Sequence, residues 1–137
     1  MSKSKKQPFK PPYSASCIQG NKFDTFGMIC ESMCKTKVFQ DLTPSAKVMY
    51  VLCRVQSASE DGRRCLFQHA KQYEREYSAD CFVFPAQHME KYGLDRRNAK
   101  KQIDLLVSAG FLDIVEENRQ QKLVNVYRFS SRWKEPN

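Results

Sequence analysis

The sequence contains no apolar run that approaches the length of a membrane span, and its N-terminus lacks the apolar core of a signal peptide. We therefore expect a cytoplasmic protein without a membrane partner. No glycine-rich phosphate loop, nucleophile motif or recognisable carboxylate pair occurs. The two histidines, His69 and His88, lack further ligands at a suitable spacing. The sequence thus predicts no enzyme activity, no cofactor and no metal site.

Disulfide and zinc patterns are also missing, although six cysteines are present. Cys30 and Cys34 would share one face of a helix, where two thiols could begin a zinc site. No Cys-x-x-Cys pair or matching histidine completes such a site, so we expect these two residues to pack in the core. Free and mostly buried thiols are expected at all six positions because no secretion signal is present. These are Cys17, Cys30, Cys34, Cys53, Cys65 and Cys81.

The chain is basic, and the excess is unevenly distributed. Residues 1–22 hold five lysines and no acid, so five of the eight net positive charges lie there and the rest carries only +3. With Pro8, Pro11 and Pro12, this segment predicts a flexible basic arm, either an inert tail or a contact for phosphates or a minor groove. Residues 23–134 are expected to form a single domain. The remaining basic excess lies in residues 96–101 and in Arg128, Arg132 and Lys134.

Residues 85–109 show the pattern of a helix-turn-helix. Pro85 suits a first helical position, and Gly93 suits the left-handed residue that follows a helix end. Asp95 can then cap a second helix through its carboxylate, and Gly110 ends that helix. Two short helices joined by a short turn that contains glycine form this motif. The second helix has an apolar stripe for packing, made of Ala99, Ile103, Leu106 and Val107.

The first two turns of this second helix are cationic. They hold Arg96, Arg97, Asn98, Lys100 and Lys101, whereas the last two turns are mostly apolar. A recognition helix that points its N-terminal end into a DNA major groove has this distribution, since Arg and Lys reach guanine edges and phosphates and Asn can read adenine. The simpler interpretation is a solvated helix start. We favour the DNA interpretation for the helix as a whole and leave open which residues contact bases.

A β-hairpin is predicted next, because two runs rich in β-branched and aromatic residues, 111–115 and 122–129, flank a polar stretch at 116–121. In the second strand, odd-numbered residues 123–129 share one face and even-numbered residues 124–128 share the other. A helix-turn-helix followed by a hairpin is a winged helix, so we expect a wing at 111–129 with its tip at 116–121. Glu116 and Glu117 beside the tip count against a continuous positive surface.

Further elements are expected around this unit. Thr43 caps and Pro44 starts a helix that is apolar on so many sides that we expect it to be buried. After a loop at 57–62, residues 64–77 predict an extra amphipathic helix, which could brace the domain or offer a dimer face. Residues 81–84 predict a short strand that could pair with the hairpin. Residues 23–40 predict either a first helix or an extended segment followed by a short helix.

Three stretches of the sequence resemble known winged-helix proteins. Residues 105–112 resemble the end of the recognition helix in many bacterial winged-helix proteins. Residues 42–50 match the pattern Leu-Ser/Thr-x-x-Ala-Lys-x-x-Tyr of the winged-helix replication-initiator families of plasmids, phages and integrative elements, including the RepA-type N-terminal domain. Residues 125–133 resemble the return strand of the wing in those families and the tail that follows it.

The resemblance covers residues 23–134 and carries an expected function. It implies duplex DNA binding, with Arg96, Arg97, Asn98, Lys100 and Lys101 in the groove and Arg119 or Lys122 on the wing. The helix around residues 61–80 is longer than the family pattern predicts. Accessory, regulatory and replication-initiation roles in a mobile genetic element all stay open.

The sequence therefore predicts a mainly α fold with a small β-hairpin, namely a winged helix-turn-helix with an extra amphipathic helix. Double-stranded DNA is the expected partner, and a homodimer stays open. The alternative is a winged helix that serves protein–protein assembly without direct DNA contact. In that case the basic start of the second helix faces solvent or docks an acidic partner.

Overall fold

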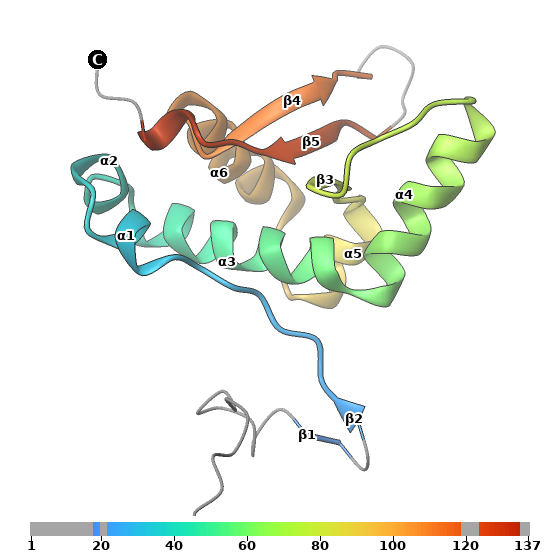
Figure 1. Cartoon of the computed structure of the whole chain (residues 1–137), viewed down its shortest axis with the longest axis horizontal. Helices are drawn as coiled ribbons and strands as arrows, with labels where there is room; N and C mark the ends of the chain where they lie inside the picture. The colour runs from blue at the N-terminus through green and yellow to red at the C-terminus, as the bar shows by residue number, and fades with distance from the viewer. Residues whose placement is uncertain (1–17, 20–21, 119–123, 135–137) are drawn as a thin grey trace, which may run out of the picture.

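The chain is mainly helical, with a small three-stranded antiparallel sheet, as expected (Figure 1). The computed structural model describes residues 18–19, 22–118 and 124–134. Most of the predicted arm, the wing-tip residues from 119 onward and Cys17 thus lie outside the described residues. The elements are β1 Ile18–Gln19, β2 Lys22–Phe23, α1 Glu31–Cys34, α2 Lys37–Gln40, α3 Pro44–Ala58, α4 Glu60–Gln72, β3 Cys81–Val83, α5 Ala86–Lys91, α6 Arg96–Ser108, β4 Leu112–Glu116, β5 Val126–Phe129 and η2 Arg132–Lys134.

Of the two predictions for residues 23–40, the extended segment followed by short helices is correct. Residues 24–30 form no regular element and run beside α3, where Gly27 lies against Arg54 and Val55 (Figure 1). The helices α1 and α2 follow. Helix α3 starts as predicted, because the Thr43 hydroxyl accepts a hydrogen bond from the backbone N–H of Ala46 at 3.1 Å.

Helix α3 is buried on one face only, so the prediction that it is buried on many sides is wrong. Met49, Tyr50 and Cys53 lie in the core, but Val48 is 56% exposed and Val51 is 39% exposed. The reason is the arrangement of layers, since α6 and the sheet both pack on the same side of α3 (Figure 1). The segment 24–30 lies against another part of the surface of α3, at Arg54 and Val55.

The predicted loop at 57–62 does not form, because α3 and α4 meet at a single residue. Ser59 donates from its hydroxyl to the carbonyl oxygen of Gln56 at 2.9 Å and accepts from the N–H of Gly62 at 2.9 Å. Gly62 is buried inside α4, and a Cβ atom there would collide with the Gln56 carbonyl oxygen. The glycine that looked like a loop residue in the sequence instead allows two helices to approach closely.

The extra amphipathic helix exists, but it spans residues 60–72 rather than 64–77. Its end is formed by Glu74, which adopts a left-handed backbone conformation with a φ of 54°. The N–H of Arg75 then returns to the carbonyl oxygen of Ala70 at 2.8 Å, the bond that usually accompanies a glycine after a helix end. Tyr77 therefore leaves the helix and lies, half-buried, in the segment that leads to β3.

The sheet has the strand order β3–β5–β4, so the predicted strand at 81–84 pairs with the hairpin. Neighbouring residues of β5 lie on opposite faces, yet Val126 and Tyr127 are both buried. One face contacts the main core through Tyr127 and Phe129. The other face forms a second small cluster, in which Val126 packs with Cys65 and Leu66 of α4. Helix α4 thus covers the face of the sheet that the other helices leave open.

The described cysteines are free, but they are less buried than expected. Cys53 and Cys81 are buried, whereas Cys34 and Cys65 are only half-buried. Cys30 is exposed because it precedes α1 as its N-cap instead of facing the core from within a helix, so the prediction that it packs in the core is wrong. None of the described helices combines the length and the apolar content needed to span a membrane.

The contact at Gly62 predicts an unusual response to alanine. Gly62→Ala should lower the free energy of unfolding by about 1–3 kcal/mol, since the added methyl group forces α3 and α4 apart. At an ordinary helical position the same change is stabilising by about 1 kcal/mol. Urea denaturation monitored by circular dichroism measures the difference. Gln68→Ala, at an exposed position of the same helix, serves as the control and should change stability by about 0.5 kcal/mol or less.

Candidate nucleic-acid interface

Two helices joined by a tight turn present the predicted site. Helix α5 begins at Ala86, one residue later than predicted, with Pro85 as its N-cap. Gly93 has a φ of 74°, which allows the N–H of Leu94 to bond back to the carbonyl oxygen of Met89 at 3.0 Å. Asp95 caps α6 as predicted, since its carboxylate accepts from the backbone N–H of Asn98 at 3.0 Å.

The burial of α6 decides which of its residues face outward. Ala99, Ile103 and Leu106 are fully buried and Val107 is half-buried, which confirms the predicted stripe. The opposite side of the helix and its first residue, Arg96, are then open. Arg96, Arg97, Asn98 and Lys101 are exposed, and Lys100 is half-buried.

Most of the predicted DNA-contacting cations in α6 are not bound to other side chains among the described residues. Within the part of the chain that the structure describes, Arg96, Arg97 and Lys101 make no ion pair or side-chain hydrogen bond. Lys100 lies 3.3 Å from Asp104 on the next turn of the helix. Helix α4 does not cover these exposed residues. Arg119 and Lys122, the predicted wing contacts, lie outside the described residues.

Asn98 differs from these cations because its side chain is held in place. Gln102, one turn further along α6 and only 7% exposed, donates from Nε2 to Asn98 Oδ1 at 3.1 Å. The other end of the Gln102 amide, Oε1, is buried and has no hydrogen-bond partner among the described residues. Gln102 was not among the predicted site residues. The available signal was its position four residues after Asn98, at the edge of the apolar stripe.

Glu116, which counted against a positive surface in the sequence, is bound inside the fold. Its carboxylate accepts from the Tyr77 hydroxyl, lies 2.7 Å from the Arg75 guanidinium and 3.5 Å from His69 Nε2. Partial burial would raise the pKa of Glu116, but the hydrogen bonds from Tyr77 and Arg75 outweigh burial and lower the pKa to about 2. This carboxylate therefore joins the loop end of the hairpin to the segment after α4.

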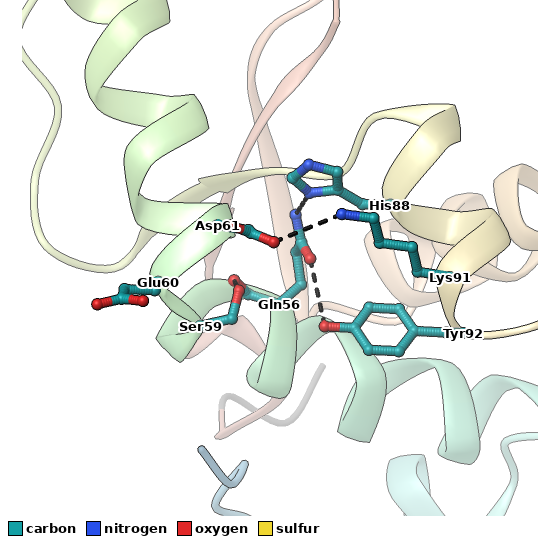
Figure 2. A pocket seen from close by; sticks show the side chains of 7 residues that line it. All are labelled: Gln56, Ser59, Glu60, Asp61, His88, Lys91 and Tyr92. Atoms are coloured by element: carbon teal, nitrogen blue, oxygen red, sulfur yellow. Dashed lines mark hydrogen bonds and ion pairs between the residues drawn. The ribbon is translucent and has the colours of Figure 1, made fainter. Parts of the chain in front are cut away.

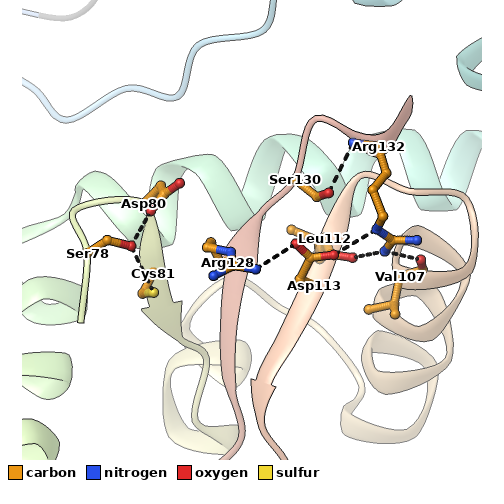
Figure 3. Close-up of polar contacts among 9 residues, drawn as sticks. All are labelled: Ser78, Asp80, Cys81, Val107, Leu112, Asp113, Arg128, Ser130 and Arg132. Atoms are coloured by element: carbon orange, nitrogen blue, oxygen red, sulfur yellow. Dashed lines mark hydrogen bonds and ion pairs between the residues drawn. The ribbon is translucent and has the colours of Figure 1, made fainter. Parts of the chain in front are cut away.

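Much of the predicted basic run at the C-terminal end is also engaged internally. Arg128 Nη2 lies 3.1 Å from one carboxylate oxygen of Asp113, and Arg132 Nε lies 2.8 Å from the other (Figure 3). Arg132 Nη2 also donates to the carbonyl oxygens of Val107 and Leu112. Partial burial would raise the pKa of Asp113, but hydrogen bonds from the two arginines lower it. Arg128 and Arg132 thus stabilise the junction between α6 and the hairpin.

A separate polar pocket of about 200 Å³ lies where α3, α4 and α5 meet (Figure 2). Gln56, only 1% exposed, donates from Nε2 to the Val83 carbonyl oxygen at 3.0 Å and lies 2.7 Å from His88 Nδ1. Tyr92 donates weakly to Gln56 Oε1 at 3.5 Å. These contacts join the end of α3 to β3 and α5, so the network holds α5 against the core.

Metal-binding clusters and similar proteins are two further indicators of function. Among the described residues, no group of three or more His, Cys, Asp or Glu side chains is close enough to hold a metal ion. Comparisons with known protein families, with curated proteins and with solved structures found no match to this chain.

The Glu116 contacts predict a dependence of stability on acid. The pKa of Glu116 in the folded chain is about 2, below its ordinary value of 4.5, so the stability it contributes is present above pH 4.5 and is lost as the pH falls toward 2. Glu116→Gln should remove this part of the dependence. Chemical denaturation at a series of pH values measures it, and parallel curves for the two proteins between those pH values would contradict the assignment.

His88 predicts a second dependence, at higher pH. Burial, and to a lesser degree the cation of Lys91, lower the pKa of His88 below its ordinary 6.5, while Asp61 acts in the opposite direction. The unfolded chain therefore takes up the proton first, and stability should fall as the pH drops below 6.5. His88→Asn keeps an acceptor for Gln56 but does not titrate. Its unfolding free energy should change less between roughly pH 7 and 5, which thermal melts at each pH would test.

Proposed function

We propose that this protein is a winged-helix DNA-binding protein, with α6 as its recognition helix. The order of elements supports the winged-helix assignment: α3, β3, α5, α6 and the β4–β5 hairpin follow one another, with α4 inserted after α3. The strand before α5 pairs with the last strand of the hairpin, which ties the hairpin to the helix-turn-helix. In this proposal the β4–β5 hairpin is the wing.

One observation carries the DNA-binding part of the proposal. Of the eight arginines that the structure describes, six contact a carboxylate, a carbonyl oxygen, a hydroxyl or an aromatic ring of the same chain. The remaining two are Arg96 and Arg97, which are consecutive residues at the exposed start of α6. Unpaired guanidinium groups at the start of a recognition helix are suited to phosphate and guanine contacts. Lys101, Asn98 and the half-exposed Lys100 extend this surface.

We further propose that the protein acts in a mobile genetic element, in replication initiation, in regulation or in an accessory role. The support for this proposal is the resemblance of residues 42–50 and 125–133 to the winged-helix replication-initiator families. Helix α3 begins with the Thr43 cap of that pattern, and Tyr50 of the pattern lies in the core. Selection of bound fragments from the host's own DNA would distinguish among these roles, because an origin, a promoter and dispersed sites give different maps.

A protein–protein assembly module is the second candidate. One observation favours it, namely that Val48 is 56% exposed and lines an apolar groove with Leu52 and Leu94. Exposed apolar side chains that lie together are typical of protein-binding surfaces. This candidate predicts that the chain does not bind duplex DNA.

A fluorescence-anisotropy titration of duplex DNA across a salt series tests the proposed function. Wild-type protein should bind with an affinity that falls steeply as salt increases, because bound cations release counterions from the phosphates. Arg96→Ala with Arg97→Ala should weaken binding by about 1–3 kcal/mol and reduce the salt slope by about 1 for each phosphate that the variant no longer neutralises.

The matched control removes the same charge from another helix. Arg63 and Lys71 are exposed on α4, so Arg63→Ala with Lys71→Ala lowers the net charge equally without touching α6. This control should bind DNA nearly as tightly as the wild type. Equal losses of affinity in both double variants would mean that net charge, not α6, drives binding, and no duplex binding by the wild type would favour the assembly module.

A further inference from the structure

We propose that Asn98 reads a base edge and that the buried Gln102 is the positioning residue that sets the orientation of its amide. This inference rests on the DNA-binding function proposed above. It separates the cationic start of α6 into one residue that recognises sequence and several that hold the backbone of the duplex. Asn98 and Gln102 lie one turn apart on α6.

Two hydrogen bonds hold Asn98, one at its backbone and one at its side chain. Its backbone N–H donates to the Asp95 carboxylate at 3.0 Å, and its Oδ1 accepts from Gln102 Nε2 at 3.1 Å. Gln102 is itself immobilised by burial. A base-reading side chain benefits from such support, since contacts to a base edge require a fixed position and direction. Arg96, Arg97 and Lys101, which have no such support among the described residues, suit phosphates, where many geometries are acceptable.

The surroundings of Gln102 argue that it is not there for stability. It lies at a groove lined by apolar side chains of α3 and the turn, including Val48, Met49, Leu52 and Leu94. Its Oε1 atom is buried without a partner among the described residues, and a buried acceptor in that state destabilises the fold. An apolar side chain would fill this place without that penalty. The amide of Gln102 supplies the hydrogen bond to Asn98, which an apolar side chain cannot form.

The direction of that hydrogen bond selects the kind of base edge. Because Asn98 Oδ1 faces Gln102, the Nδ2 group is the end left to point outward, and it can only donate. In the major groove, acceptors are offered by N7 of purines, O6 of guanine and O4 of thymine. We therefore assign to Asn98 a base whose major-groove edge presents an acceptor to it.

Selection from a random duplex library, with the full chain, tests this assignment. Gln102→Glu, followed as the pH is raised until the buried carboxyl group ionises, places a carboxylate beside Asn98. A carboxylate can only accept a hydrogen bond, so it turns Nδ2 of Asn98 inward and Oδ1 outward. The preference at one base position should then move, by on the order of tenfold, toward the donor edges of adenine N6 or cytosine N4. Gln102→Met, which cannot form the bond, should flatten the preference at that same position. Neither variant should alter the salt slope, because no phosphate contact changes.

Two surface variants keep the test decisive if the buried substitutions disturb folding. Asn98→Ala, at an exposed position, should erase the preference at the same single base position. Arg97→Ala should instead weaken binding to all sequences alike and lower the salt slope. If the wild type binds duplex DNA but Asn98→Ala leaves every base preference unchanged, the inference is wrong and the proposed function stands. If the wild type shows no salt-dependent duplex binding, the proposed function fails as well.

Discussion

The packing of α6 on α3 is the contact on which the candidate site depends. Ala46 of α3 and Ala99 of α6 are both fully buried, and such small side chains let two helices approach closely. Ile103 and Leu106 continue the same stripe into the main core. Once that side of α6 is buried, helical geometry places Arg97 and Lys101 on the outer side. Arg96 shares the side of Ala99 and Ile103 and is exposed because the helix begins there. The direction in which Arg97 and Lys101 point is thus a consequence of apolar packing.

A second constraint acts on the hairpin, through the extra helix α4. A three-stranded sheet that packs on helices with only one face would expose Cys81 and Val126 on the other, but α4 covers both. The same helix is followed by Arg75 and Tyr77, whose contacts with Glu116 hold the loop end of the hairpin. Of the two roles that the sequence left open for this helix, bracing the domain is the one that these contacts support. The internal ion pairs also mean that fewer cations are free to contact a partner than the number of basic residues indicates.

Sequence patterns predicted the bounds of α5 and α6 well because these bounds depend on local chemistry. Asp95 caps α6, and Gly93 adopts the left-handed conformation after α5, as glycine does at many helix ends. The end of α4 was missed because Glu74 adopts the same conformation without being glycine. The junction at Gly62 was missed for the opposite reason, since there glycine serves the close approach of two helices rather than a turn. Both errors arise where tertiary contacts override local preference.

The residues of the candidate site also differ in whether local sequence patterns could predict their position. Arg97 and Lys101 lie off the apolar stripe by helical periodicity, so they could be placed outward from the sequence alone. Arg96 shares the side of Ala99 and Ile103, and its exposure follows from its place at the start of the helix. What periodicity cannot give is which polar side chain is held by another, because that depends on how the edge of the stripe meets α3. Gln102 sits at that edge, and only the fold makes it a buried neighbour of Asn98. Affinity and selectivity in this site would therefore have separate physical origins, the first in unpaired charge and the second in a fixed amide.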